Sequence, residues 1–106
     1  PHAGYMYSGG VAARAYRQLI DQEFEVVVVI SPSHRMYFEE VSVFNGLAYK
    51  TPFGTIPVDQ ELARHLTTLH PNIIYSDFGH SNDEHALEVQ LPFLQYVLEN
   101  LKIIPI

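Results

Sequence analysis

Hydrophobic residues recur at helical spacing in three stretches of the chain. The first stretch follows Ser8, the expected N-cap, and consists of Val11, Ala12, Ala15, Tyr16, Leu19 and Ile20. The second follows a cap at Asp59 and places on one helix face Leu62, Ala63, Leu66 and Leu69. The third begins near Glu84 and contains Ala86, Leu87, Leu91, Leu94, Val97, Leu98 and Leu101. Pro92 lies within this third stretch and lacks the N–H that would bond to residue 88, so we expect a kink or a break there.

Short runs typical of strands separate these helical stretches. Residues 25–30, EVVVVI, do not alternate with polar residues, which predicts a strand buried on both faces of a parallel sheet. Further strands are predicted at residues 72–76 and from Ile103. Residues 41–44 and 47–50 flank Asn45-Gly46, which predicts a hairpin, whereas residues 51–57 and 77–83 are expected to be loops. The pattern predicts a three-layer α/β fold with flanking helices, a mostly parallel sheet and a small antiparallel insertion.

Composition adds an expectation about the size of the domain. The chain has 106 residues, enough for one modest domain, yet only 17% of them are charged, against about 25% in an ordinary globular domain. Because the apolar fraction of 47% is ordinary, part of the nominal surface is expected to be covered. The chain also opens on Pro1 and closes on KIIPI, like a strand cut short. We therefore expect residues 1–106 to form a single partial domain that is internal to a larger one. The alternative is a complete small domain.

Charge and cysteine content exclude several classes of function. The formal net charge is −6, so no basic stripe is available for a nucleic-acid backbone. The absence of cysteine excludes disulfides and cysteine-containing metal sites within these residues. The longest apolar run, Val26–Ile30, is far shorter than the roughly 20 residues that cross a bilayer. We therefore expect neither a nucleic-acid nor a membrane partner, and a cytoplasmic location.

Two histidines lie where α/β proteins place their sites, just beyond the carboxyl ends of strands. His34 follows the EVVVVI run after a Ser-Pro-Ser turn, and His2 precedes the first predicted helix. Two neutral imidazoles from adjacent strand ends would form half of a metal site with open positions. For each histidine the alternative is a hydrogen-bonded surface residue.

A further candidate lies at the start of the third helical stretch. His85 and Glu88 are three residues apart and share a helix face, so they could form an acid/base pair or offer a carboxylate to a metal. A solvated helix end is an equal alternative for them. Glu84 and Glu88 would repel each other unless a cation or a donor separates them. We interpret Asp83 and Glu84 as acids that favour the positive end of the helix dipole. Near the two histidines in sequence, a pocket for an aromatic or apolar ligand is predicted from Tyr5, Tyr7 and Ser33, although ordinary packing is an alternative.

Three blocks carry a resemblance: PHAGYMYSG at residues 1–9, SPSH at residues 31–34 and EHALEVQLPFLQ at residues 84–95. In this order they closely resemble the MEMO protein family, whose microbial members are of the AmmeMemoRadiSam system protein B type. The resemblance implies a fold similar to that of class III extradiol ring-cleaving dioxygenases, the LigB-type non-haem iron enzymes. It also implies association with a radical-SAM protein and a further small protein.

The resemblance implies roles for individual residues. His2 and His34 correspond to two ligands of a metal, Fe(II) or copper, and the block with His85 lies beside the same pocket. A third ligand, a cysteine in animal members, and an Asp/His pair come from a part of the family sequence that follows the residue matching Ile106. Residues 76–80, SDFGH, look like a later family motif but come too early in the order, so we interpret them as unrelated.

These observations leave three hypotheses about function. The first is a metal-dependent redox enzyme, or a descendant of one, whose exact reaction is unknown. The second is a non-catalytic module that binds a peptide or protein through the vestigial active-site pocket. The third is a hydrolase that uses water bound to zinc, since the same ligands suit that metal.

Overall fold

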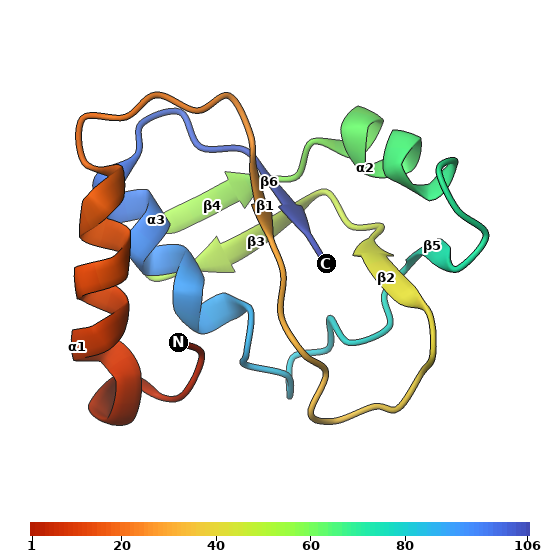
Figure 1. Cartoon of the computed structure of the whole chain (residues 1–106), viewed down its shortest axis with the longest axis horizontal. Helices are drawn as coiled ribbons and strands as arrows, with labels where there is room; N and C mark the ends of the chain where they lie inside the picture. Colours follow the sequence, from red (N-terminus) through yellow and green to blue (C-terminus); the bar gives the residue numbers. More distant parts are fainter.

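A computed structural model describes residues 1–106, and its helices and strands form an α/β fold, as predicted (Figure 1). The helices are α1 (Tyr5–Tyr16), α2 (Gln60–Thr67) and α3 (Leu91–Val97), with short 3-10 turns η1 (Arg17–Leu19) and η2 (Glu88–Gln90). The strands are β1 (Val27–Val29), β2 (Val41–Phe44), β3 (Ala48–Thr51), β4 (Gly54–Pro57), β5 (Ile73–Ser76) and β6 (Ile103–Pro105). None of the helices combines the length and the apolar character that crossing a bilayer requires.

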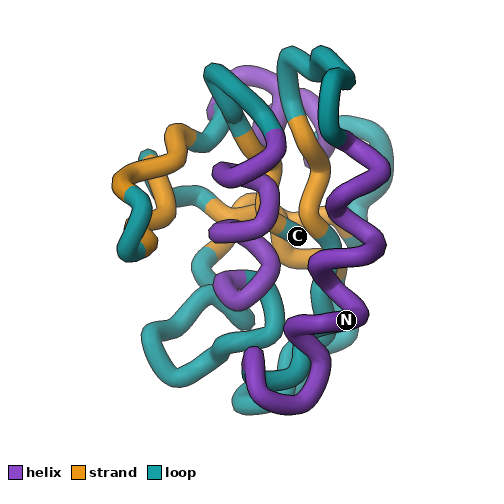
Figure 2. The backbone as a smooth tube through the Cα atoms, turned by 90° about the vertical axis from the view of Figure 1, so that its left-hand side faces the viewer, coloured by secondary structure: helices purple, strands orange, loops and turns teal.

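Strand β6 separates two hydrophobic clusters because its successive side chains point to opposite faces. Ile103 packs with Val29 of β1, Ile56 of β4 and four leucines of the α3 region, Leu91, Leu94, Leu98 and Leu101. Ile104 packs on the other face with Val43 of β2 and Ala63 of α2. Helices α1 and α3 lie side by side on the first of these faces (Figure 2). The strands form three two-stranded sheets, β1–β6, β2–β5 and β3–β4, and β6 lies between the two clusters.

Two of the three strand pairs are parallel, and for β1 the unalternating EVVVVI run predicts such a pairing. Strand β1 pairs with β6 and β2 pairs with β5, both in parallel, whereas β3 and β4 are antiparallel. The prediction that the EVVVVI strand is buried on both faces is wrong. Val29 is buried, but Val28 is 49% exposed, because α2 packs against β2, β5 and β6 rather than against β1.

The predicted hairpin at Asn45-Gly46 is wrong, and so is the loop predicted for residues 51–57. Strand β2 continues past Phe44 along β5, since the Asn45 N–H donates to the Ser76 carbonyl at 3.1 Å. The hairpin instead joins β3 to β4 through Pro52-Phe53, where Gly54 adopts a φ of 117°. Such a backbone conformation favours glycine. The expected antiparallel insertion thus exists, but it lies several residues further along the chain.

The predicted helix boundaries are confirmed at one helix and corrected at two. Asp59 caps α2, with its Oδ1 accepting from the Leu62 N–H at 3.1 Å. Helix α1 begins earlier than predicted, after Gly4, and the Ser8 hydroxyl donates to the Ala3 carbonyl at 3.0 Å instead of capping the helix. The third helix does not begin near Glu84, because α3 begins at Leu91 and only the 3-10 turn η2 precedes it. The predicted helical stretch is thus broken near Pro92, as expected, and Pro92 occupies the first turn of α3, where no N–H is needed.

Candidate functional site

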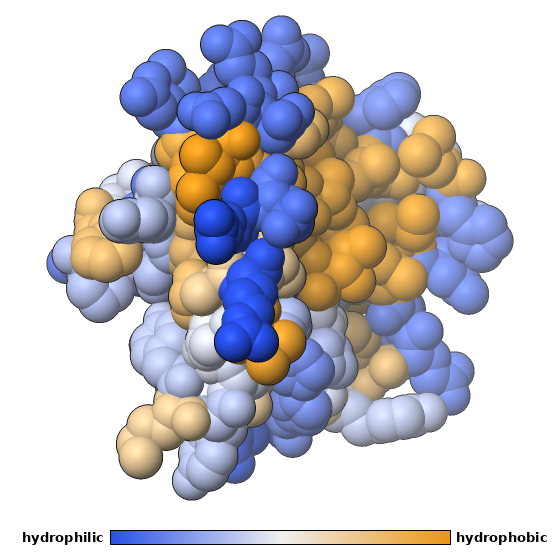
Figure 3. Space-filling view, turned by 60° about the vertical axis from the view of Figure 1, so that its left-hand side comes forward, coloured by the Kyte–Doolittle hydropathy of each residue, from blue (hydrophilic) through white to orange (hydrophobic).

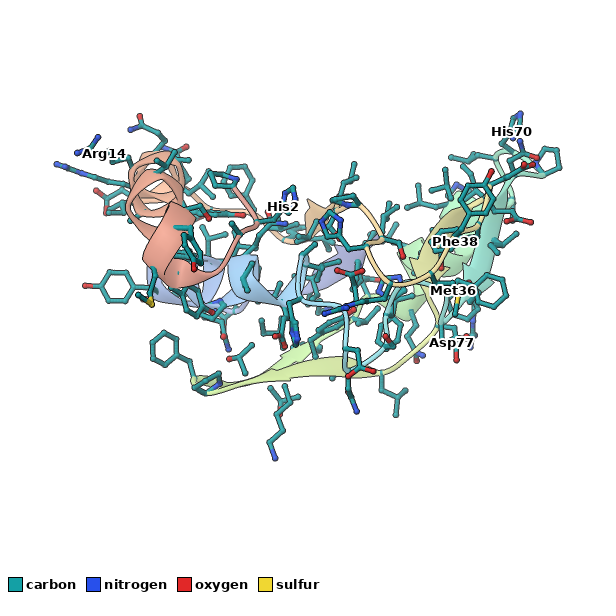
Figure 4. The ribbon with its side chains drawn as sticks, turned by 90° about the horizontal axis from the view of Figure 1, so that it is seen from below. His2, Arg14, Met36, Phe38, His70 and Asp77 are labelled. Carbon is teal, nitrogen blue, oxygen red and sulfur yellow. The ribbon has the colours of Figure 1, made fainter.

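The structure brings His2 and His34 together. Their ring centroids are 5.4 Å apart and the ring planes are tilted by 32°. His34 lies in the loop that follows β1, and His2 precedes α1, so the pair joins the two segments that the strand-end argument selected. In Figure 4 His2 lies in the middle of the view, between α1 and the loop that carries Met36 and Phe38. Two side chains that could bind one ion therefore face the same space.

The loop after β1 is held in place by Glu84. The Oε2 atom of Glu84 accepts hydrogen bonds from the backbone N–H of His34 at 2.5 Å and of Arg35 at 3.2 Å. Its Oε1 atom accepts from the N–H of His85 at 3.1 Å and of Ala86 at 3.2 Å. Glu84 is only 8% exposed. The interpretation of Glu84 as an acid at a solvated helix end is therefore wrong, because the buried carboxylate of this residue bridges two segments.

These contacts also set the charge of Glu84. Burial raises the pKa of a carboxyl group, but the backbone hydrogen bonds from His34, Ala86 and Arg35, together with the charge of His34, outweigh it and leave the pKa of Glu84 below its ordinary value. Hydrogen bonds to an ionised acceptor are stronger than bonds between neutral groups. Glu84 is accordingly an ionised carboxylate at neutral pH, and its charge is compensated by amides.

His85 and Glu88 form the pair that their spacing predicts. The His85 Nδ1 atom lies 2.7 Å from the Glu88 Oε1 atom, and the two side chains are 58% and 47% exposed. The His85 N–H and the His34 N–H are both bound by the Glu84 carboxylate, so this pair lies next to the loop that carries His34. In this arrangement the carboxylate fixes the orientation of the imidazole ring.

The three residues predicted to line a pocket lie in different surroundings. Tyr5 packs edge-on against Phe93 with ring centroids 6.0 Å apart, and burial together with the charge of Glu88 raises its pKa. Ser33 closes a turn by donating to the Met36 carbonyl at 2.7 Å and lines a hollow of about 290 Å³ beside the loop. Tyr7 is 86% exposed and lines neither that hollow nor the groove beside Tyr5.

A second histidine environment was not anticipated from the sequence. His80 Nε2 lies 3.3 Å from the backbone carbonyl oxygen of Ser42, which can only accept, so Nε2 carries the proton. His80 Nδ1 then accepts from the Tyr49 hydroxyl at 2.7 Å. Burial lowers the pKa of His80, although its bond to Ser42 and the charge of Asp77 oppose this. Burial, Glu88 and Glu84 raise the pKa of Tyr49. Both groups are therefore neutral at pH 7. The contact between Tyr49 and His80 has no local signal in the sequence, because the two residues come from a strand and a loop that are distant along the chain.

Comparison with known proteins identifies the family. The model of the family described as Memo-like protein matches residues 1–106. The chain belongs to the Memo-like family. Among similar proteins, a MEMO1 family protein of Methanobrevibacter smithii is 45% identical over 107 residues, and one of Sulfolobus acidocaldarius is 43% identical over 108 residues. A third, from Pyrobaculum aerophilum, is 42% identical over 107 residues. Each alignment covers all of this chain and 38% of the relative.

The Memo-like chain thus spans about two fifths of the length of the curated relatives that it matches. Within it, no group of three or more His, Cys, Asp or Glu residues lies close enough together to hold a metal ion. The His2–His34 pair supplies two nitrogen donors, and the carboxylate that bonds the His34 backbone, that of Glu84, is already engaged by four backbone N–H groups. These residues fit two positions of a metal site but do not complete one.

Proposed function

We propose that this Memo-like chain contributes two ligands, His2 and His34, to a non-haem metal site of a cytoplasmic protein. The observation that supports the proposal is the approach of the two imidazole rings to 5.4 Å from two segments separated by α1 and β1. Imidazole suits iron, copper and zinc, and the resemblance to extradiol dioxygenases favours Fe(II) or copper. When bound, such a metal would supply redox chemistry with O₂, and the remaining ligands would come from sequence that this chain does not contain.

The neighbouring residues have roles that follow from their contacts. His85, oriented by Glu88 at 2.7 Å, would accept or donate a proton beside the metal ligands. Tyr5 carries a phenol whose raised pKa keeps it protonated, so its hydroxyl could donate a hydrogen bond to a bound molecule. The reaction would thus be metal-dependent oxidation, with its substrate undefined. Association with a radical-SAM protein and a small partner protein remains part of this proposal, and it rests on the family resemblance.

Metal titration tests the proposal. Fe(II) under anaerobic conditions, Cu(II) and Zn(II) would be titrated into the purified longer protein that would carry the remaining ligands, and bound metal would be quantified by elemental analysis, with His2→Ala and His34→Ala as variants. We expect one equivalent of iron or copper, lost in both variants. His65→Ala, which changes an exposed histidine of α2, is the matched control and should bind as the wild type does. Unchanged metal content in the His2 and His34 variants contradicts the proposal, and a preference for zinc would support the hydrolase instead.

A second candidate function is binding of a peptide segment of a partner protein. Between α1, α3 and the β3–β4 turn lies an apolar groove of about 590 Å³, lined by Tyr5, Tyr16, Ile20, Phe53, Phe93 and Tyr96. One end of the groove, at Ile20 and Tyr96, opens into a hollow lined by Asp21, Glu23, Glu25 and Glu99. Figure 3 shows hydrophobic surface next to hydrophilic residues that gather at the top of the view. Apolar walls and an acidic end fit an amphipathic segment with lysine or arginine at one end.

Peptide binding is distinguished from metal binding by its requirements. A Leu/Lys amphipathic peptide is expected to bind the chain in the presence of chelator, and a Leu/Glu counterpart is expected not to bind. Tyr96→Ala should weaken binding about tenfold, whereas Tyr37→Ala, with 86% exposure against 83% for Tyr96, should not. Equal affinity for the two peptides would contradict this candidate, and so would loss of binding in the histidine variants.

A further inference from the structure

We infer that Glu84 is the positioning residue of the proposed metal site: its carboxylate holds the backbone of His34 at a fixed place relative to that of His85. The inference rests on the proposed function, because it names the residue that holds one ligand of that same site in place. It concerns a residue whose own side chain does not reach the metal, so its role differs from those of His2, His34 and His85.

The four bonds of Glu84 join parts of the chain that are distant in sequence. Two of them bind its own turn, at His85 and Ala86. The other two bind His34 and Arg35, 50 and 49 residues away. A carboxylate that served only to cap its own turn would need the first two bonds alone. The remaining two therefore indicate a role in placing the loop after β1.

All the acceptor capacity of Glu84 is used in this way. An ionised carboxylate offers about four lone-pair sites, and each oxygen of Glu84 accepts two N–H groups. Because Glu84 is also buried, it has no free lone pair for an ion in front of the histidines. This excludes Glu84 as a ligand in the present arrangement and leaves the orientation of His34 as its contribution.

Other contacts of the same loop restrict it around His34. The Arg35 Nε–H donates to the Asp83 carbonyl at 3.2 Å, which is a second link between the two segments. On the far side of His34, the Ser33 hydroxyl donates to the Met36 carbonyl at 2.7 Å and closes the turn. His34 is thus held from both directions, and the Glu84 carboxylate supplies the buried part of the restraint.

Two substitutions test the inference. Glu84→Gln replaces one acceptor oxygen by an NH₂ group, which faces backbone N–H groups and cannot accept their hydrogen bonds. Glu84→Asp keeps the charge but shortens the side chain, so it can serve its own turn and no longer reach His34. Asp59→Ala is the matched control, because Asp59 is also a carboxylate that accepts a backbone N–H but lies at the start of α2. It lowers stability without touching the His34 loop.

Two measurements separate positioning from mere stability. Supporting residues of a metal ligand usually change metal affinity by about 10–100-fold, so the dissociation constant for Fe(II) or Cu(II) should rise about tenfold or more in both Glu84 variants and stay unchanged in Asp59→Ala. In the metal-free protein, hydrogen exchange of the His34 and Arg35 amides should become about tenfold faster or more in the Glu84 variants, while the Val43 amide in β2 keeps its rate.

The outcomes distinguish this inference from the proposed function. If the wild type binds no metal, the proposed function fails, while faster exchange at His34 and Arg35 still supports the role of Glu84. If the wild type binds metal, wild-type affinity in the Glu84 variants overturns the inference. An equal loss of affinity in Asp59→Ala also overturns it, because general destabilisation would then explain the effect. Unchanged exchange at His34 and Arg35 overturns it whatever the metal result.

Discussion

Gly46→Ala is expected to destabilise the protein through one identifiable overlap. A Cβ atom added at Gly46 would overlap the ring of Phe44 at its Cζ and Cε1 atoms. That ring is held from two sides, since it packs edge-on against Tyr49 with centroids 5.0 Å apart and lies tilted over His80 at 4.8 Å. Phe44 therefore cannot move aside without disturbing the pair in which the Tyr49 hydroxyl donates to His80.

The size of the effect follows from three contributions. Overpacking a filled site costs about 1–3 kcal/mol, and a disturbed aromatic pair costs about 0.5–1.5 kcal/mol. Replacing glycine also reduces the entropy of the unfolded chain, which offsets about 0.4–1 kcal/mol. The backbone at Gly46 is not in the left-handed region, so no strain in φ adds to this. We expect a net loss of about 2 kcal/mol in the free energy of unfolding.

Urea denaturation followed by far-UV circular dichroism measures this loss, which corresponds to a midpoint lower by about 1 M for a slope of about 2 kcal/mol/M. Gly10→Ala is the matched control. Gly10 lies within α1, where an added Cβ meets nothing within 4 Å. Alanine in place of a helical glycine should stabilise the protein by about 0.5–1 kcal/mol. The same substitution, glycine to alanine, is thus expected to lower the free energy of unfolding at position 46 and to raise it at position 10. A Gly46→Ala variant as stable as the wild type would refute the reasoning.

Three further predictions concern stability and pH. Leu91→Ala should cost about 2–5 kcal/mol in the same urea assay, because Leu91 is 0% exposed at the centre of the larger cluster; a cost under 1 kcal/mol would mean that the site collapses around the smaller side chain. Asp59→Ala should cost about 1 kcal/mol through loss of the α2 cap, and an unchanged midpoint would contradict that role. The pKa of His80 is lowered in the folded state by burial, so the unfolded state binds the extra proton first as the pH falls. The stability that neutral His80 contributes is therefore complete above about pH 6.5 and is lost as the pH falls through the lower folded pKa. Urea midpoints measured from pH 8 to 5 should fall less steeply in His80→Gln than in the wild type. Equal slopes in the two proteins would disprove this contribution of His80.

Features with a local chemical cause were the ones that the sequence predicted well. Asp59 caps a helix through its own next residues, and Pro92 breaks the third helical stretch because of its own missing N–H. Strand pairing has no such local cause. Asn45-Gly46 has the composition of a hairpin turn, but β2 pairs with β5, which lies some thirty residues further along. The glycine at position 46 is explained instead by the close approach of Phe44. The hairpin that Asn45-Gly46 predicted is therefore absent, and a packing contact accounts for the glycine instead.

The candidate site, like the fold, could be predicted from the sequence only in part. The approach of His2 and His34 agrees with the expectation that residues following parallel strands gather at one edge of a sheet, although only His34 follows a strand of this structure. The role of Glu84 could not be predicted, because half of its hydrogen-bond donors lie about fifty residues earlier in the chain. Nothing in the neighbouring residues distinguishes a buried acid of this kind from one at a solvated helix end.

The error in the predicted start of the third helix also led to a wrong expectation about the charges of Glu84 and Glu88. On one continuous helix these like charges, four residues apart, would repel and call for a cation between them. The chain avoids this because Glu84 lies in a turn before η2, where four amides compensate its charge, while Glu88 in η2 pairs with His85. No cation is needed between the two carboxylates. The exposed His85–Glu88 pair therefore forms independently of Glu84, whose buried carboxylate accepts hydrogen bonds from four backbone N–H groups.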